Sequence, residues 1–161
     1  MAKHKKLSWI VVVLWMALIF SLSHQPASKS SEMSTGITEM IVVAAEQVVP
    51  GIAENFGQLE HIVRKNAHFF IYLILGVLAI HAFSKSGLRS FRGFGLSVVL
   101  CVLYAISDEF HQLFVDGRSG ELRDVFIDSS GAIVGIAMYK ITENLLKRNS
   151  QKAFEGKEVQ G

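Results

Sequence analysis

Hydrophobic residues in this chain gather in four long blocks instead of alternating regularly with polar residues. The blocks cover about residues 7–24, 62–83, 94–115 and 124–141. Each is close to the roughly 20 residues that a helix needs to cross a bilayer. A helix at the surface of a soluble protein would carry apolar residues on one face only. The pattern therefore predicts an all-α integral membrane protein with four transmembrane helices.

The first block has two interpretations. It follows Lys3, Lys5 and Lys6, and a cleaved signal peptide also starts with basic residues and an apolar run. This run is at the long end for a signal peptide, lacks an A-x-A-like cleavage site and is followed by further apolar blocks. We therefore expect the block to be retained as the first span.

Residues 26–60 are mostly polar, but apolar side chains recur within them at helical spacing. These side chains are Ile37, Met40, Ile41, Ala44 and Val48. A period of this kind predicts a short amphipathic helix in the loop after the first span. Two alternatives stay open for it: a helix on the bilayer surface or over the bundle, and a helix packed on the spans for stability.

Basic residues at the block ends predict the topology. They precede the first block, separate the second from the third and follow the fourth, in the last two cases as Lys85, Arg89, Arg92, Lys147 and Arg148. Basic loops favour the cytoplasmic side, so we expect both termini inside and the loop helix outside. Residues 1–146 then form a single domain, and 147–161 a polar cytoplasmic tail that we expect to be frayed.

Composition supports this class and excludes others. Half of the 161 residues are hydrophobic and only 19% are charged, where a soluble chain carries about a quarter. The net charge of +2 comes from residues at block edges and not from a basic face, so we exclude a nucleic-acid partner. The single Cys101 forms no internal disulfide. We expect a multi-pass protein of the cell membrane, with the lipid bilayer as its surroundings.

Polar residues at the outer ends of the blocks are the candidate site. The apolar cores of the second to fourth blocks are short, so a full crossing draws their polar ends into the outer leaflet. The residues drawn in are His68, Asp108, Glu109, His111, Gln112 and Asp128. Ionisable groups in a bilayer cost roughly 2.5 kcal/mol or more at mid-depth and normally face protein or water. We therefore expect them to face one another at a common depth.

Helical spacing supports this convergence. The stripes are Lys65, His68, Tyr72 and Gly76 in the second block, Asp108, His111 and Gln112 in the third, and Asp124, Asp128, Gly131 and Gly135 in the fourth. Gly131 and Gly135 form a small-xxx-small pattern, which lets another helix approach closely. We interpret Gly76, Gly131 and Gly135 as structural residues beneath the polar site.

Three chemistries fit such a site. Enough nitrogen and oxygen ligands for a divalent metal are present in His68, Asp108, Glu109, His111, Asp124 and Asp128. They lack a recognised pattern such as His-Glu-x-x-His, so we assign no metal ligand, and nothing identifies a cofactor. In an enzyme, the catalytic groups would be His68, Asp108, Glu109 and Asp124. An anion-binding site needs no reaction, and its residues would be Arg64, Lys65, Tyr72, Gln112, Arg118 and Asp128.

At these residues the chain resembles the VanZ-like membrane protein family. The resemblance rests on residues 20–25 (FSLSHQ), 64–76 (RKNAHFFIYLILG) and 107–112 (SDEFHQ), followed by Gly117, Arg118, Asp124, Asp128, Gly131 and Gly135. Asp128 stands where the family pattern often has Asn. It therefore adds one negative charge to the site.

The resemblance implies a phenotype. The namesake of the family is associated with low-level resistance to teicoplanin, a glycopeptide with a fatty acyl tail, without a change in the cell-wall precursor. Our leading hypothesis is a protein that handles or shields an amphiphile at the outer leaflet, its partner being a lipid headgroup, a lipid-linked precursor or a lipoglycopeptide. One alternative is an intramembrane hydrolase or transferase acting on a lipid headgroup or lipid-linked phosphate. Another is a packing factor whose polar cluster only sets helix register.

Overall fold

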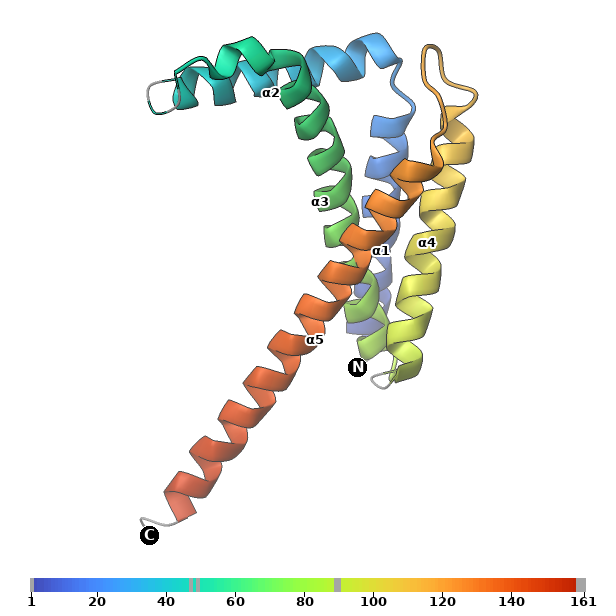
Figure 1. The fold of residues 1–161 in the computed structure, drawn as a ribbon. Helices are drawn as coiled ribbons and strands as arrows, with labels where there is room; N and C mark the ends of the chain where they lie inside the picture. Colours follow the sequence, from blue (N-terminus) through green and yellow to red (C-terminus); the bar gives the residue numbers. More distant parts are fainter. Residues whose placement is uncertain (1, 47, 49, 89–90, 159–161) are drawn as a thin grey trace.

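Every regular element of the described chain is a helix. The computed structural model describes residues 2–46, 48, 50–88 and 91–158, and these contain no strand. The elements, shown in Figure 1, are α1 (Ala2–Ser23), α2 (Ala27–Ala45), the 3-10 helix η1 (Ile52–Asn55), α3 (Phe56–Lys85), α4 (Phe91–Gln112) and α5 (Leu122–Glu158).

Four of these helices, α1, α3, α4 and α5, are long and apolar enough to cross a membrane. The predicted four-helix membrane fold is therefore confirmed. Helix bounds differ from the expected spans: α3 starts already at Phe56, and α4 ends at Gln112 instead of near residue 115. Arg89 of the predicted basic connection lies outside the described residues.

The C-terminal segment, which we expected to be a frayed polar tail, is helical as far as residue 158. Helix α5 continues without interruption from the fourth apolar block through Glu158. Residues 142–155 contain neither Gly nor Pro and consist largely of good helix formers such as Leu, Lys, Glu and Arg. The polar residues after the fourth apolar block therefore mark the end of the apolar stretch, but the helix continues through them.

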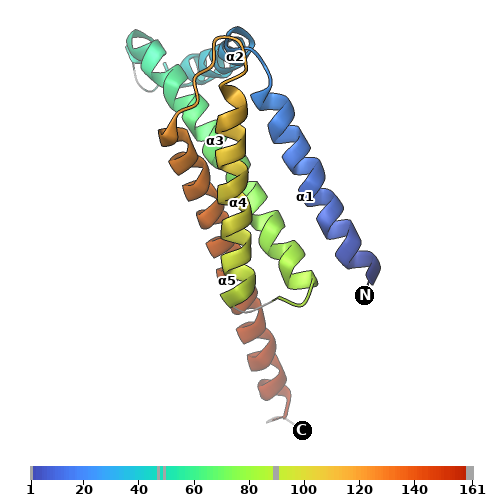
Figure 2. The ribbon, with the colours of Figure 1, turned by 90° about the vertical axis from the view of Figure 1, so that its right-hand side faces the viewer.

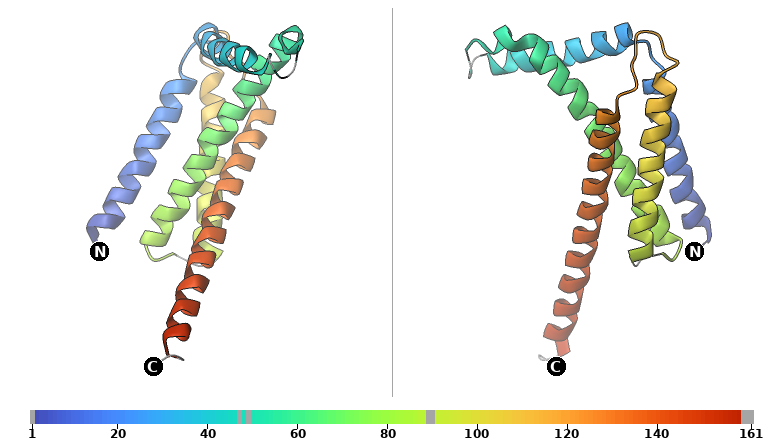
Figure 3. Two further views of the ribbon diagram at one scale, coloured as in Figure 1. Left: turned by 90° about the vertical axis from the view of Figure 1, so that its left-hand side faces the viewer. Right: turned by 45° about the vertical axis from the view of Figure 1, so that its right-hand side comes forward.

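The helices define two ends of the molecule. Helices α1, α4 and the second half of α3 run side by side, while α2 lies across one end of the bundle together with the start of α3 (Figures 1 and 2). Both chain termini lie at the opposite end, as Figure 3 also shows. We call these the α2 end and the terminal end. Which of them faces the cell exterior stays a prediction.

Helices α3 and α5 form the closest contact of the bundle, and glycines make it possible. A Cβ on Gly131 would lie 2.2 Å from the carbonyl oxygen of Phe69, and one on Gly135 would lie 2.1 Å from that of Leu73. On the facing helix, a Cβ on Gly76 would lie 2.2 Å from the carbonyl oxygen of Ala132. Residues with side chains at these positions would force the two backbones apart.

Helix α1 is attached to the bundle by its aromatic residues and by those of α4. Trp15 donates a hydrogen bond from Nε1 to the carbonyl oxygen of Ile71, 3.0 Å away, and the hydroxyl of Tyr104 donates to the carbonyl oxygen of Met16. The outer side of α1 leaves large apolar residues exposed, including Val13 and Leu14. Such a surface is compatible with surrounding lipid.

Helix α2 meets α3 through its polar side. Ser34 and Thr38 are its buried residues, whereas Ile37, Met40 and Ile41 are 50%, 74% and 42% exposed. The apolar residues that predicted this helix are therefore largely exposed instead of being buried against the bundle. Its contact with α3 depends on hydrogen bonds instead.

Candidate functional site

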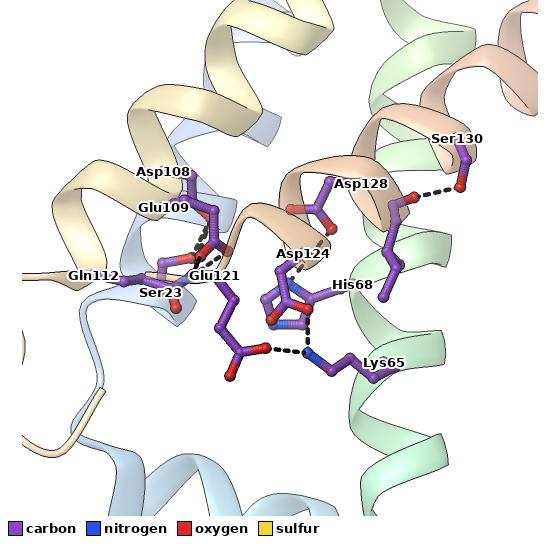
Figure 4. Close-up of polar contacts among 11 residues, drawn as sticks. Ser23, Lys65, His68, Asp108, Glu109, Gln112, Glu121, Asp124, Asp128 and Ser130 are labelled. Atoms are coloured by element: carbon purple, nitrogen blue, oxygen red, sulfur yellow. Dashed lines mark hydrogen bonds and ion pairs between the residues drawn. The ribbon is translucent and has the colours of Figure 1, made fainter. Parts of the chain in front are cut away.

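Two polar layers lie one above the other between α3, α4 and α5 at the α2 end. The first, which we call the rim layer, consists of Lys65, Glu121 and Asp124. Lys65 Nζ forms an ion pair with Asp124 and lies 3.5 Å from Glu121 Oε2 (Figure 4). The side chains of Lys65 and Asp124 are less than one-fifth exposed. The rim layer is thus a lysine neutralised by two carboxylates.

The second layer, the deep layer, lies about one helical turn further along α3 and α5 and consists of His68, Asp108, Glu109 and Asp128. His68 Nδ1 lies 3.5 Å from Asp128 Oδ1, which is long for a hydrogen bond. Asp128 is fully buried, and within the described chain neither of its carboxylate oxygens accepts a hydrogen bond. This layer contains more negative charge than its partners neutralise.

Two consecutive carboxylates of α4 complete the deep layer. Asp108 Oδ2 accepts hydrogen bonds from Ser23 Oγ (2.8 Å) and from Gln112 Nε2 (3.5 Å), but its Oδ1 is buried with no partner among the described residues. Glu109 Oε2 accepts from the backbone N–H of Glu121 at 2.9 Å. Both acids are nearly inaccessible, with exposures of 2% and 5%.

Arg64 is held in a separate network that ties α2 to α3. It lies 2.8 Å from Glu60 Oε1 and donates a weaker hydrogen bond to Ser31 Oγ at 3.3 Å. Glu60 Oε1 also accepts from the hydroxyls of Ser31 and Ser34, at 2.8 and 2.9 Å. The charge of Arg64 is therefore already matched by an acid on its own helix.

Arg118 differs from the other two cations of the site. It lies in the loop between α4 and α5, is half-buried, and forms no ion pair with any described carboxylate. Burial lowers the pKa of its guanidinium, although an arginine stays protonated in proteins. The loop is fixed beside α2 because the backbone N–H of Ala27 donates to the carbonyl oxygen of Asp116 at 3.1 Å. Arg118 is thus a positioned cation without an acidic partner in the described chain.

Two pockets meet at these residues. The polar pocket, of about 210 Å³, is lined by rim-layer residues and by the α4–α5 loop. The apolar pocket, also of about 210 Å³, lies between α1, α2 and α3 and is lined mainly by residues such as Ile19, Met33 and Ile71. The residues that line both are Ser30, Arg64, His68 and Arg118. A polar and an apolar compartment therefore share one wall.

Most of the predicted site residues lie together. His68, Asp108, Glu109 and Asp128 form the deep layer, Lys65 and Asp124 belong to the rim layer, and Arg64 and Arg118 line both pockets. Tyr72 is buried beside the deep layer, and its hydroxyl has no partner in the described chain. Gln112 links Asp108 to Glu109. The glycines at 76, 131 and 135 lie in the α3–α5 contact.

Several partners of the predicted site residues were not themselves predicted, and one predicted residue lies outside the deep layer. Ser23, Glu60 and Glu121 were not selected, although each bonds to a selected residue. Ser23 was within reach of sequence reasoning, because it ends an apolar span within the motif at residues 20–25. His111 shares a stripe with Asp108 but contacts His24 instead, with Nδ1 of His24 3.1 Å from Nε2 of His111.

One comparison with known proteins identifies the family of this chain. A search of curated proteins and a search of solved structures each returned no match. A sequence profile of the family described as VanZ/LLP1 matches residues 8–143, which cover most of α1 and α5, all of α3 and α4, and both polar layers. The chain is therefore a multi-pass membrane protein that belongs to the VanZ/LLP1 family.

Proposed function

We propose that this protein binds an amphiphile at the outer face of the cell membrane. Its anionic headgroup would lie in the polar pocket and its apolar chain in the apolar pocket. The observation that carries this proposal is the shared wall: Arg64, His68 and Arg118 line both pockets. A molecule with a charged end and an apolar end matches two compartments that meet in this way.

Arg118 supports an anionic headgroup. Arg64 is paired with Glu60, and Lys65 is paired with Asp124 and Glu121. An incoming anion would have to displace an acid from either of them. Arg118 has no such competitor among the described residues, and its planar guanidinium suits a phosphate or carboxylate that accepts two hydrogen bonds.

The position of the apolar pocket supports a chain that arrives from the bilayer. Its walls come from α1, α2 and α3, including Leu22, Ile37 and Val63. Large apolar residues that line the pocket are themselves partly exposed, such as Met33 and Ile37. A lipid tail therefore reaches the pocket along surfaces that are already apolar, so that only its headgroup has to exchange water for protein.

The charge distribution supports placing the α2 end outside. Lys5, Lys6, Lys85, Arg92 and Arg148 lie on the segments at the terminal end (Figure 1). Basic residues near span ends favour the cytoplasmic side. With the terminal end inside, both pockets face the outer leaflet, where teicoplanin acts. The family resemblance then suggests that the apolar pocket receives the acyl tail of a lipoglycopeptide or of a lipid-linked precursor.

The test is the minimum inhibitory concentration of teicoplanin and of tail-less vancomycin in a sensitive Gram-positive host. We expect the wild type to raise the value for teicoplanin and not for vancomycin. Arg118→Gln should abolish the rise, whereas Arg123→Gln should keep it, because Arg123 is a neighbouring exposed arginine that lines neither pocket. Membrane levels are matched by blot.

A second pair of variants tests the chain compartment. Ala67→Phe should fill the apolar pocket, which Ala67 lines, and should remove the rise for teicoplanin. Ala44→Phe adds the same ring to an exposed position on α2 that lines neither pocket, and should have no effect. Equal resistance with all four variants, or none with the wild type, would refute the proposed function.

One observation favours an enzyme as the second candidate. His68 lines both pockets and faces the buried Asp128, as a general acid oriented by a carboxylate would. In that case Asp108 or Glu109 would be the general base, and the substrate would be a lipid headgroup or a lipid-linked phosphate. Purified protein incubated with lipid extract should then change the headgroup composition seen by mass spectrometry. His68→Gln should stop that change without lowering the amount of protein in the membrane.

A further inference from the structure

Three potential metal ligands converge in the deep layer from three different helices. His68 comes from α3, Glu109 from α4 and Asp128 from α5, and their side chains point toward one another in Figure 4. One ligand atom from each of these residues lies within 4.8 Å of the other two. Sequence spacing did not reveal this group, because no two of its members share a helix.

Asp128 lacks the hydrogen-bond donors that a buried carboxylate requires, whereas Glu109 accepts from the backbone N–H of Glu121 and from Gln112. Asp128 is 0% exposed, and no described donor bonds to either of its oxygens. The Oδ1 atom of Asp108 and the hydroxyl of Tyr72 are likewise buried without a partner in the described chain. Unpaired buried polar groups of this number are unusual, since nearly all such groups find a hydrogen bond or an ion. Something outside the chain is expected to complete them.

The charges nearby do not balance the layer. Asp108, Glu109 and Asp128 can contribute three negative charges, and the deep layer contains only His68 as a basic group. Arg118 attracts Asp108 and Glu109 from the α4–α5 loop but forms no ion pair with either among the described residues. The nearest lysine, Lys65, is already matched by Asp124 and Glu121. A buried charge without a counter-charge costs several kcal/mol in general. One divalent cation would offset two of the carboxylates.

We propose that His68, Glu109 and Asp128 bind one divalent transition-metal cation, with Zn²⁺ and Mn²⁺ as the best candidates. An imidazole nitrogen with two carboxylates suits these ions, whereas Mg²⁺ and Ca²⁺ prefer sites made of oxygen atoms alone. The sequence pattern alone led to no metal assignment at these residues. This site also goes beyond the proposed amphiphile binding and does not depend on it.

The ligand atoms lie near one another but wider apart than around a bound ion. Zinc lies about 2.0–2.2 Å from nitrogen and oxygen ligands in a tetrahedral arrangement, so two of its ligand atoms are about 3.3–3.6 Å apart. The observed limit of 4.8 Å therefore requires the widest pair of side chains to close by about 1 Å when the ion binds. Three protein ligands leave a further coordination position. His68 also lines both pockets, so this position would lie next to the headgroup compartment.

The test measures metal directly, without lipid or antibiotic. The full chain is purified in detergent with an affinity tag that contains no histidine, and its metal content is determined by mass spectrometry. We expect about one equivalent of zinc or manganese in the wild type, and at least a tenfold loss in Asp128→Asn and in Glu109→Gln. After chelation, added Zn²⁺ or Mn²⁺ should raise the melting temperature of the wild type and not that of Asp128→Asn.

Two control variants separate this site from other polar groups. His111→Ala removes the His24–His111 pair, which could hold adventitious zinc, and Glu60→Gln removes an acid that is engaged with Arg64. Both should retain the metal. The proposal is overturned if the wild type carries less than a tenth of an equivalent and neither ion shifts its melting temperature, or if only His111→Ala loses the metal. Metal binding without a teicoplanin effect would leave this inference standing and remove the proposed function.

Discussion

The rim layer and the deep layer are built from the same kinds of residue but are completed differently. Each joins a base on α3 to an aspartate on α5: Lys65 to Asp124 in the rim layer, and His68 to Asp128 in the deep layer. In the rim layer a second acid, Glu121, also faces the base. In the deep layer, Asp128 has no hydrogen bond within the described chain.

This difference separates two roles for charge at a helix junction. A paired ion network fixes the register of the helices and needs nothing else. Buried acids without partners destabilise the protein until a ligand, a proton or an ion arrives. The rim layer therefore explains the assembly of α3 and α5, whereas the deep layer is the better candidate for function. The following substitutions should break the two layers to different extents.

Gly131→Ala should have the largest effect, because it disturbs the helix contact beneath both layers. Its Cβ would lie 2.2 Å from a backbone carbonyl oxygen of α3, an atom that cannot move independently. Overpacking typically costs 1–3 kcal/mol, and a clash between two backbones should reach about 3 kcal/mol or more. The measurement is thermal unfolding in detergent, together with the amount of protein in the membrane.

Gly36→Ala is the matched control for this prediction. It makes the same change in α2, where nothing lies within 4 Å of the added Cβ. Alanine favours the helix over glycine by about 1 kcal/mol, so this variant should be neutral or slightly more stable. Equal melting temperatures for the two variants would show that the α3–α5 contact is not as close as described.

Lys65→Met should have the next largest effect, in the rim layer alone. It leaves Asp124 and Glu121 facing each other without a cation. Loss of one partner from a fully buried pair costs 3–5 kcal/mol, and partial exposure should reduce this to about 2 kcal/mol. We expect a lower melting temperature in detergent and no change in the metal content of the deep layer.

The double variant Lys65→Met with Asp124→Asn sharpens this prediction. If the ion pair accounts for the loss, the double variant should be more stable than Lys65→Met alone, because the unpaired charge has been removed. Additive losses from the two substitutions would contradict a direct interaction between the residues.

Ser23→Ala should have a smaller effect, at the edge of the deep layer. Ser23 Oγ donates one of the two hydrogen bonds that Asp108 Oδ2 accepts, at 2.8 Å. Hydrogen bonds to charged groups contribute about 1.5–3 kcal/mol, and the remaining bond from Gln112 should limit the loss to about 1 kcal/mol. This loss is measured as a decrease in the free energy of unfolding in a denaturing detergent. The control is Ser21→Ala, because the Ser21 hydroxyl bonds only within its own helix, and it should lower the free energy of unfolding by less.

Helical periodicity predicted the parts of this site that lie within one helix. The apolar blocks gave the four spans, and spacings of three and four residues placed Lys65 above His68 and Asp124 above Asp128. Helical spacing depends only on residues within one segment. It can therefore be used without knowing which helices pack together.

The remaining parts depend on contacts between helices, which spacing does not specify. Ser23 meets Asp108 although they are 85 residues apart. The polar side of α2 packs inward because Ser31 and Ser34 bond to Glu60, while hydrophobic periodicity alone emphasised its apolar side. The two pockets and the group of His68, Glu109 and Asp128 also depend on contacts between helices. No single segment of the sequence contains all of their residues.

Replacing the α5 aspartate of each layer by asparagine compares the two layers most directly. Of all these variants, Asp128→Asn has the smallest expected effect on stability. Asp124→Asn should destabilise the protein, because it removes the charge that holds Lys65. In chelated protein, Asp128→Asn should leave the melting temperature unchanged or raise it by the equivalent of about 1 kcal/mol, because a buried charge without a hydrogen bond disappears while the shape is kept. A loss of stability in Asp128→Asn equal to that in Asp124→Asn would mean that Asp128 is paired after all. The two layers would then have the same structural role, and the case for a functional deep layer would fail.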